Sequence, residues 1–240
     1  MTPGSKVPLR ESTRKLVCGR HTSMINLMRP ALIVFLLTGC TSANSRSMPY
    51  KSWYLGFSAP AYMEVWIETA DVIDIRGQVY RRAMSGVAAM LRPPNNSGDP
   101  KGWPKRAGMG GGKYVSGADL PKKIYVRWQS LVEPQTYKMV IDIPEWTREV
   151  MRKEEKVFCA FDGKVINEYR EAISIRLVPG GIAKVWVTGP CLNPIEVTTV
   201  KAQIDPRGPY EGKSGGHHRP LSPVSKAYVE KFGVPYDSWK

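Results

Sequence analysis

Residues 172–188 constrain the fold more than any other part of the sequence. Two runs rich in Ile, Val and Leu, residues 172–178 and 182–188, flank the turn sequence Pro179-Gly180-Gly181. Glycine accepts the positive φ angles of tight hairpin turns, and branched apolar residues favour strands on both sides. The segment therefore predicts a β-hairpin, and the fold must contain a sheet that accommodates it.

Other segments rich in Val, Ile, Tyr and Trp also favour strands. Met63, Val65 and Ile67 alternate with more polar neighbours, which is the period of a strand with one buried face. The remaining segments predicted as β are 72–80, 122–130, 136–143, 157–161 and 195–204. Residues 84–91 fit a strand or a short helix equally well.

Two segments carry the end signals of short helices. Residues 144–153 begin with Pro and an acid, end with basic residues, and space Trp146 and Val150 by four positions. Residues 222–233 supply a serine N-cap, a proline at the first helical position and a glycine beyond the end. Together, the segments predict a mainly β fold: an antiparallel β-sandwich with two short helices.

Two Pro- and Gly-rich segments, residues 92–112 and 205–219, predict long loops. A loop of about 20 residues is unusual inside a compact domain and is either functional or disordered. Trp103 lies in the middle of the first loop, and Trp is enriched among the hot spots of interfaces. We expect Trp103 to contribute to partner binding; packing in the core is the alternative, since aromatic residues bury large areas.

An apolar run, residues 30–39, precedes Cys40. The run is too short to cross a bilayer, which needs about 20 apolar residues. It matches the apolar region of a secretory signal peptide, with Arg29 as its positive flank. Its end, Leu37-Thr38-Gly39-Cys40, resembles the lipobox of bacterial lipoproteins, in which the Cys is lipidated and the peptide is cut before it. We therefore expect Cys40 to carry a lipid, while an uncleaved apolar segment with a chance Cys is the alternative.

These features divide the chain into three parts. Residues 1–39 are predicted to be a leader that ends in a lipoprotein signal peptide. Within it, residues 1–23 are expected to be an artefact of start-site choice, because later methionines would give a leader of conventional length. Residues 40–49 form a predicted lipidated, flexible tether. Residues 50–240 are long enough to form a single β-rich domain, expected in the periplasm.

The residue after Cys40 indicates a location. In the enterobacterial sorting rule, an Asp at this position favours retention at the inner membrane, and here Thr41 occupies it. In this respect the sequence resembles lipoproteins that are sorted to the outer membrane. We expect the protein to be lipid-anchored at the periplasmic face of the outer membrane.

The cysteines also suit an exported protein. Cys18 lies in the leader and Cys40 is the predicted lipid site, which leaves Cys159 and Cys191. Because an exported chain reaches an oxidising compartment, these two predict a disulfide. Two buried free thiols are the alternative.

The excess of basic over acidic residues gives little indication of nucleic-acid binding. The chain carries a net charge of +14, which falls to +9 when residues 1–39 are removed. The bases are scattered, with no long run and no recognisable reading helix, so no nucleic-acid partner is predicted. Anionic lipid head groups or an acidic partner fit an envelope protein better.

No complete catalytic motif is present. The histidines are His21, in the leader, and the adjacent pair His217 and His218. Residues 212–216 match the letters G-x-S-x-G around Ser214, but that motif needs a strand before it and a helix after it, and here Pro and Gly surround it. Two adjacent histidines seldom bind one metal ion without further ligands. We predict a protein that is not an enzyme, with no cofactor and no metal site; a hydrolase that uses Ser214 is the alternative.

Two segments, residues 53–57 and 123–137, resemble a family of bacterial lipoproteins of undefined biochemical activity. Its members share a lipobox, a Trp near the start of the domain and a Leu-Pro…Trp-x-Ser-x-x-Glu-x-x-x-Tyr-like centre. In this sequence the centre consists of Leu120, Pro121, Trp128, Ser130, Glu133 and Tyr137. The similarity covers most of the chain after Cys40, and it supplies no catalytic residue.

Genes of this family often lie beside type VI secretion phospholipase effectors. The resemblance therefore implies an immunity protein, a tethered periplasmic inhibitor that binds an incoming sibling toxin. Its expected partners are the membrane, through the lipid anchor, and a secreted lipase effector. A structural or assembly lipoprotein of the envelope, without a toxin partner, is the alternative.

Overall fold

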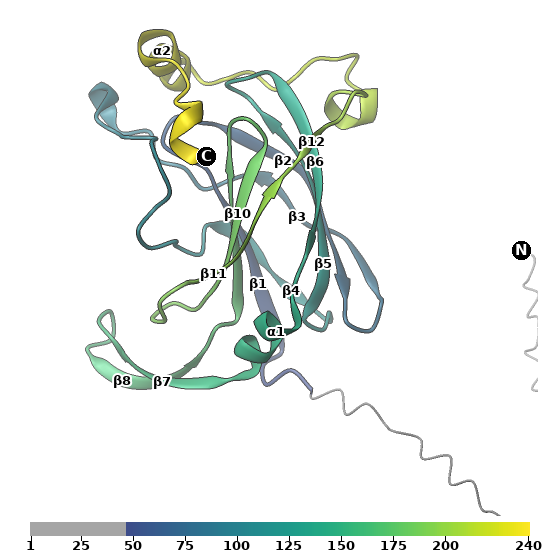
Figure 1. Ribbon diagram of the computed structural model, residues 1–240, viewed down its shortest axis with the longest axis vertical. Coiled ribbons are helices and arrows are strands. Elements are labelled where there is room, and N and C mark those ends of the chain that lie inside the picture. Colours follow the sequence, from purple (N-terminus) through teal and green to yellow (C-terminus); the bar gives the residue numbers. More distant parts are fainter. Residues whose placement is uncertain (1–46) are drawn as a thin grey trace, which may run out of the picture. The chain divides into compact units, whose positions relative to one another are not determined.

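The computed structural model describes residues 47–240. The predicted leader, the predicted lipid site Cys40 and most of the predicted tether lie outside the described residues. Two five-stranded sheets and a separate two-stranded ribbon account for all the strands of the described part (Figure 1). The prediction of a mainly β sandwich with two helices is confirmed.

The first sheet has the strand order β11-β10-β9-β1-β4. Its strands are β1 (Ser52–Ser58), β4 (Gly111–Ser116), β9 (Ala172–Val178), β10 (Ile182–Thr188) and β11 (Ile195–Lys201). β9 and β10 form the predicted hairpin, with Gly180 and Gly181 both at positive φ in its turn. Neighbouring strands are antiparallel except for β1 and β9, which pair in parallel, a detail that the sequence did not indicate.

The second sheet has the order β12-β6-β5-β2-β3, and all its neighbouring strands are antiparallel. Its strands are β2 (Val65–Asp74), β3 (Val79–Val87), β5 (Pro121–Ser130), β6 (Gln135–Asp142) and β12 (Gln203–Ile204). The predicted β segment 72–80 is divided by a turn between β2 and β3. Residues 84–91, left open between strand and helix, continue β3 to Val87 and then leave the sheet without forming a helix.

The segment 195–204, predicted as one strand, is divided between the two sheets. β11 belongs to the first sheet and β12 to the second. At Ala202, between them, the backbone amide still donates to the carbonyl of Gly181, 2.7 Å away, in register with the β10–β11 ladder, and the chain then joins the second sheet at β12. A strand that switches sheets forms a corner of a sandwich. The C-terminal loop that follows therefore starts at the edge of the second sheet.

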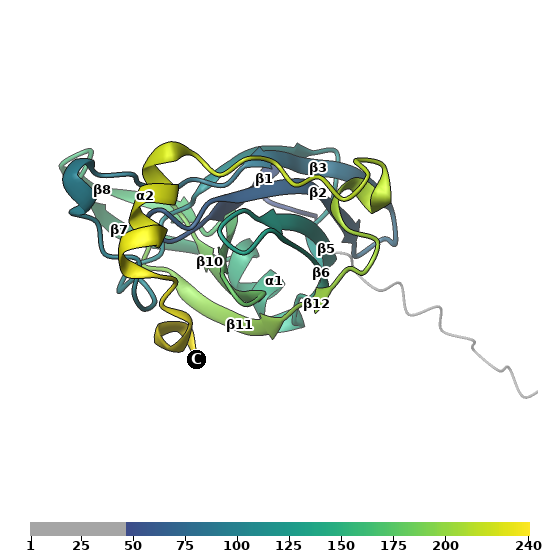
Figure 2. The same ribbon diagram turned by 90° about the horizontal axis from the view of Figure 1, so that it is seen from above.

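The core lies between the sheets, and strand alternation decides which residues enter it. Trp53 and Trp128 are fully buried there. Seen from above, the strands of both sheets surround this core (Figure 2). Along β5, Ile124, Val126 and Trp128 are core residues, which places Tyr125, Arg127 and Gln129 on the outer face.

Both predicted helices are confirmed. α1 (Glu145–Arg152) buries Met151 in the core. α2 (Pro223–Phe232) is capped by Ser222, whose hydroxyl accepts a hydrogen bond from the Ser225 amide. The ring of Tyr228, on α2, stacks on Tyr62 with 4.1 Å between ring centroids. Three short 3₁₀ segments complete the described chain: η1 (Pro94–Asn96), η2 (Pro209–Gly212) and η3 (Tyr236–Trp239).

The two-stranded ribbon consists of β7 (Glu154–Cys159) and β8 (Lys164–Tyr169). The sequence predicted only the first of these strands, at residues 157–161, and in the structure that strand pairs with β8 outside both large sheets. The predicted disulfide between Cys159 and Cys191 is confirmed, with 5.1 Å between the Cα atoms. It attaches the ribbon to the loop after β10. Within residues 47–240, no helix is long and apolar enough to span a membrane.

Candidate functional site

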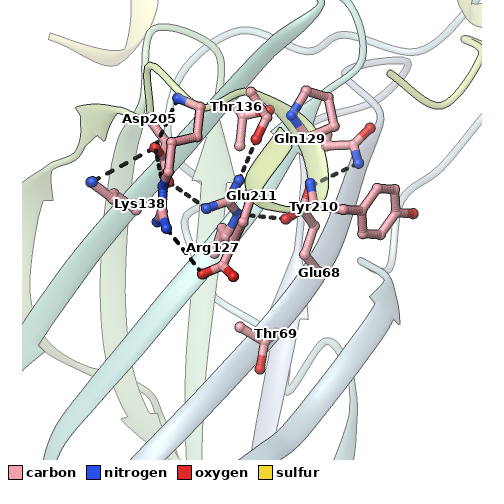
Figure 3. A network of polar contacts seen from close by, with 12 residues as sticks. Glu68, Thr69, Arg127, Gln129, Thr136, Lys138, Asp205, Tyr210 and Glu211 are labelled. Atoms are coloured by element: carbon pink, nitrogen blue, oxygen red, sulfur yellow. Dashed lines mark hydrogen bonds and ion pairs between the residues drawn. The ribbon is translucent and has the colours of Figure 1, made fainter. Parts of the chain in front are cut away.

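The candidate site is built around a break in the regular pairing of β2 with β5. β2 pairs with β5 through Ile67 and Trp128, and the next pair joins Thr69 to Arg127. Glu68 is therefore an extra residue in its strand, a β-bulge, and bulges re-aim side chains near functional sites. The bulge brings the Glu68 carboxylate to Arg127 on the outer face of the second sheet (Figure 3).

Arg127 is the centre of a polar network, although it is only 2% exposed. Its Nε donates to Glu68 Oε2 at 2.5 Å, and its terminal nitrogens donate to the Asp205 carboxylate and the Gly208 carbonyl. Gln129 Nε2 donates to the other Glu68 oxygen at 2.9 Å. A buried charge is tolerated only when it is paired and hydrogen-bonded. Arg127 meets that condition with partners from two separate segments, β2 and the loop that begins at Asp205.

The predicted loop 205–219 is irregular, as expected, and it lies against this outer face. The Asp205 amide donates to the Thr136 carbonyl at 2.9 Å, and the Arg219 amide to Gln129 Oε1 at 2.8 Å. The Tyr210 amide donates to Glu68 Oε1 at 2.8 Å. Each contact joins the loop to a strand of the second sheet. The loop is thus held by the same side chains that surround Arg127.

Two titrating groups in this network have shifted pKa values. Hydrogen bonds from Arg207 have the largest effect on Asp205 and, with the charge of Arg127, lower the pKa of that carboxyl to about 2 despite its burial. Burial lowers the pKa of His218, whose Nε2 lies 3.2 Å from Thr136 Oγ1. At neutral pH Asp205 is therefore charged and His218 is neutral.

A groove of about 680 Å³ opens beside the network on the same face. Above the buried Glu68–Arg127 pair it is lined by Arg81, Arg82, Tyr125, Tyr210, Glu211 and Lys213. A second hollow, of about 540 Å³, lies on the other side of Tyr125 and includes Lys138, Lys201 and Arg207. Tyr125 lines both hollows, which gives the outer face a continuous, mixed polar and aromatic surface.

Three residues that line the groove have a strained backbone. Arg82, Tyr210 and Glu211 have φ angles of 53°, 51° and 59°. This left-handed conformation costs a non-glycine residue about 1 kcal/mol or more, and such strain clusters at functional sites. Carboxylates hold two of the three: the Arg82 amide donates to Asp71 Oδ1 at 2.8 Å, and the Tyr210 amide donates to Glu68.

The structure places Trp103 away from this groove, against the first sheet. Its ring meets that of Trp186 edge to face, 6.1 Å between centroids, and Lys184 Nζ lies 4.8 Å from the Trp103 ring. The side chain is partly buried and packs on the small cluster around Tyr62. Its predicted role in partner binding stays a prediction.

The G-x-S-x-G letters do not form a nucleophile elbow. The Ser214 hydroxyl donates to the Pro209 carbonyl at 3.3 Å, in a loop with no strand before it. His218 contacts Thr136 rather than Ser214. Among the described residues, no three His, Cys, Asp or Glu side chains are placed to hold a metal ion.

The sequence alone did not indicate that Glu68, Arg127 and Asp205 belong to a site. Arg127 occupies an outward position in an alternating strand, where an arginine normally indicates a solvated face. Asp205 opens a Pro- and Gly-rich turn, which predicts a surface loop. One sequence feature could have indicated the pair: an acid, Glu68, and a base, Arg127, each lie on the polar face of a predicted strand. The β-bulge that brings them together has no sequence signature.

Comparison with protein-family models matches most of the chain to a known family. The family described as "Protein of unknown function (DUF2931)" matches residues 40–237. No curated protein and no solved structure matches the chain.

Proposed function

We propose that this chain, which belongs to the DUF2931 family, is a lipid-anchored envelope protein that binds a protein partner through the groove beside Arg127. The partner we propose is a secreted phospholipase effector of a type VI system, which the bound protein inhibits. The proposal is for an immunity protein rather than an enzyme.

One observation carries the binding role. Arg82, Tyr210 and Glu211 hold strained conformations around a single groove, and the buried Arg127 network fixes the loop that contains two of them. A surface that is already rigid loses less conformational entropy when it binds. Hydrogen bonds to the Glu68 and Asp71 carboxylates therefore offset the backbone strain. The exposed side chains that line the groove stay available to contact a partner.

The residue types in the groove favour a protein partner. Tyr and Arg are enriched at protein interfaces and among their hot spots, and the groove offers Tyr125, Tyr210, Arg81 and Arg82. The acids Asp71 and Glu211 line the same groove as these bases. Such mixed charge suits a folded protein surface better than the uniform negative charge of nucleic acid.

Three points support the anchor. The sequence before Cys40 resembles a lipoprotein signal, and the family match begins at Cys40. The disulfide between Cys159 and Cys191 suits an oxidising compartment. The described chain begins beside α1, whereas η2, which borders the groove, lies toward the opposite end (Figure 1). An anchored domain would thus present its groove away from the lipid.

Co-expression tests the inhibitory role. We expect the protein, directed to the periplasm, to relieve the toxicity of a phospholipase effector encoded beside its gene. Lys213→Glu, in the groove, should restore toxicity, whereas Lys226→Glu, an exposed lysine on α2, should not. An effector that stays fully toxic with the unaltered protein contradicts the immunity role and favours the alternative, an assembly lipoprotein.

Lipid labelling tests the anchor separately. Cys40→Ser should abolish incorporation of a labelled fatty acid and release the domain from the membrane fraction. Two or more acyl chains hold a protein stably, so the modification alone suffices. Labelling that persists in Cys40→Ser would refute this assignment.

A further inference from the structure

The tip of the β7–β8 ribbon exposes a group of large apolar side chains. Phe161, in the turn between the strands, is 97% exposed, and Phe158 is 61% exposed. Val165 is the strand partner of Phe158 and is also exposed. Single exposed apolar residues are ordinary, but a cluster at one tip marks a surface that contacts a protein or a membrane.

The described chain enters the domain at the base of this ribbon. The ring of Tyr50 packs on Tyr169 of β8, with 5.7 Å between centroids. The Tyr50 hydroxyl also donates to the Met151 carbonyl of α1, 3.1 Å away. The first described residues, α1 and the ribbon therefore share one end of the domain (Figure 1).

We propose that the ribbon tip, formed by Phe158, Phe161 and Val165, inserts into the surface of the lipid bilayer in which Cys40 is anchored. The inference deepens the proposed function and depends on its lipid anchor. It assigns the ribbon a second, weaker contact with the membrane that orients the domain.

The covalent chain allows this contact. Tyr50 lies ten positions after Cys40, so an extended chain between them spans at most about 35 Å. The ribbon, from Glu154 to Cys159, extends about 17 Å. The tether is therefore long enough for the tip and the lipid to reach the same bilayer surface, and short enough to keep the tip near it.

The chemistry of the tip favours apolar insertion over attraction to charged lipids. Residues 153–165 contain three lysines and three acids, so the segment has no net charge. Aromatic side chains suit the membrane–water interface. Trp146, on the adjacent helix α1, is partly exposed at the same end. We expect binding to zwitterionic lipid with little dependence on salt.

The disulfide makes the contact effective in orienting the domain. Cys159 ends β7, immediately before the turn that contains Phe161, and it is bonded to Cys191 in the loop after β10. The tip is thus fixed to the body of the domain rather than held only by the base of the ribbon. Insertion at the tip would hold the groove beside η2 away from the lipid.

Vesicle partitioning of the mature chain with Cys40→Ser tests the proposal without the contribution of the lipid anchor. We expect this protein to co-sediment weakly with phosphatidylcholine vesicles, and Phe158→Ser combined with Phe161→Ser to reduce the partition coefficient at least tenfold. Phe232→Ser is the matched control, because Phe232 is 54% exposed on α2. It should leave partitioning unchanged, and added phosphatidylglycerol should have little effect.

Two results would overturn the proposal. The first is that the double variant and its parent partition equally into vesicles, or that neither partitions at all. The other is a parent that sediments as a dimer and a double variant that is a monomer, which would assign the tip to a second copy of the chain. Fatty-acid labelling of the unaltered protein separates the two claims. Labelling of Cys40 without ribbon-dependent partitioning supports the anchor and rules out the membrane contact of the ribbon. Ribbon-dependent partitioning without labelling of Cys40 supports the membrane contact and rules out the anchor.

Discussion

Arg127 and Glu68 form an ion pair across β5 and β2, with 2.5 Å between Arg127 Nε and Glu68 Oε2. Both side chains are almost completely buried, although each lies on the outer face of its sheet. The C-terminal loop that starts at Asp205 covers them and supplies the second carboxylate. This pair therefore joins the sheet, the loop and the adjacent groove, and several measurable properties depend on it.

Arg127→Ala should destabilise the domain by about 3–5 kcal/mol, because it leaves the buried Glu68 carboxylate without its cationic partner and removes one of the partners of Asp205. Urea unfolding measures this loss. The matched control is Lys123→Ala, which removes an exposed ion pair with Asp142 and should cost less than about 1 kcal/mol. Similar losses in both variants would show that the Arg127 network does not stabilise the fold.

Asp205 should make stability depend on pH in the acid range. Its pKa in the folded protein, about 2, is below the ordinary value of 3.8. Its stabilisation, about 2 kcal/mol, is therefore fully present above pH ~4 and is lost as the pH falls toward ~2. In Asp205→Asn this part of the pH dependence should disappear, whereas Asp142→Asn, at an exposed position, should retain it. Unfolding free energies at several pH values decide between these outcomes.

Removing the disulfide should loosen the ribbon before it affects the sheets. Cys159 and Cys191 are 32 residues apart, and closing such a loop stabilises by about 3–4 kcal/mol. Besides the disulfide, the β7–β8 ribbon contacts the domain near its base, where the Tyr169 ring packs on Tyr50 and Glu168 accepts a hydrogen bond from the Cys191 amide. In Cys159→Ser/Cys191→Ser, hydrogen exchange should accelerate in β7 and β8 and stay slow in β5 and β9. Unchanged exchange in the ribbon would contradict this.

Gly112→Ala should disrupt the pairing of β1 with β4. A Cβ atom at this position would lie 2.0 Å from the Leu55 carbonyl oxygen, on the neighbouring strand. Such overpacking costs about 1–3 kcal/mol. Gly108→Ala is the control in the preceding loop, where an added Cβ has no neighbour within 4 Å. The midpoint temperature of thermal unfolding should be lowered clearly only in Gly112→Ala. Equal midpoints in both variants would contradict the close packing of Gly112 against Leu55.

Local chemistry predicted the elements that depend on nearby residues. The turn at Gly180 and Gly181 predicted the β9–β10 hairpin. The Pro, acidic and basic residues at the ends of α1 predicted that helix, and the Ser222 cap predicted α2. The disulfide followed from the number of cysteines and the expected compartment. In each case the relevant residues lie close in sequence, or a simple count leaves one pairing.

The features that the sequence did not indicate depend on contacts between distant segments. β1 and β9 are more than 100 residues apart, so nothing local specifies their parallel pairing. The Glu68 bulge is visible only in the register between β2 and β5. Arg127 looked like a solvated residue because its cover, the loop after Asp205, follows it by 78 positions. The candidate site is made of these long-range contacts, which explains why it was missed while the strands were predicted.

Titration calorimetry between residues 47–240 and the proposed partner, a phospholipase effector encoded beside the gene, tests the central claim most directly. We predict a stoichiometric one-to-one complex that Arg81→Glu, at a groove position whose side chain is 83% exposed, weakens at least tenfold. Lys226→Glu, on α2, should bind as the unaltered domain does. No binding by the unaltered domain, or the same affinity for Arg81→Glu, would contradict the proposal that this groove recognises the effector.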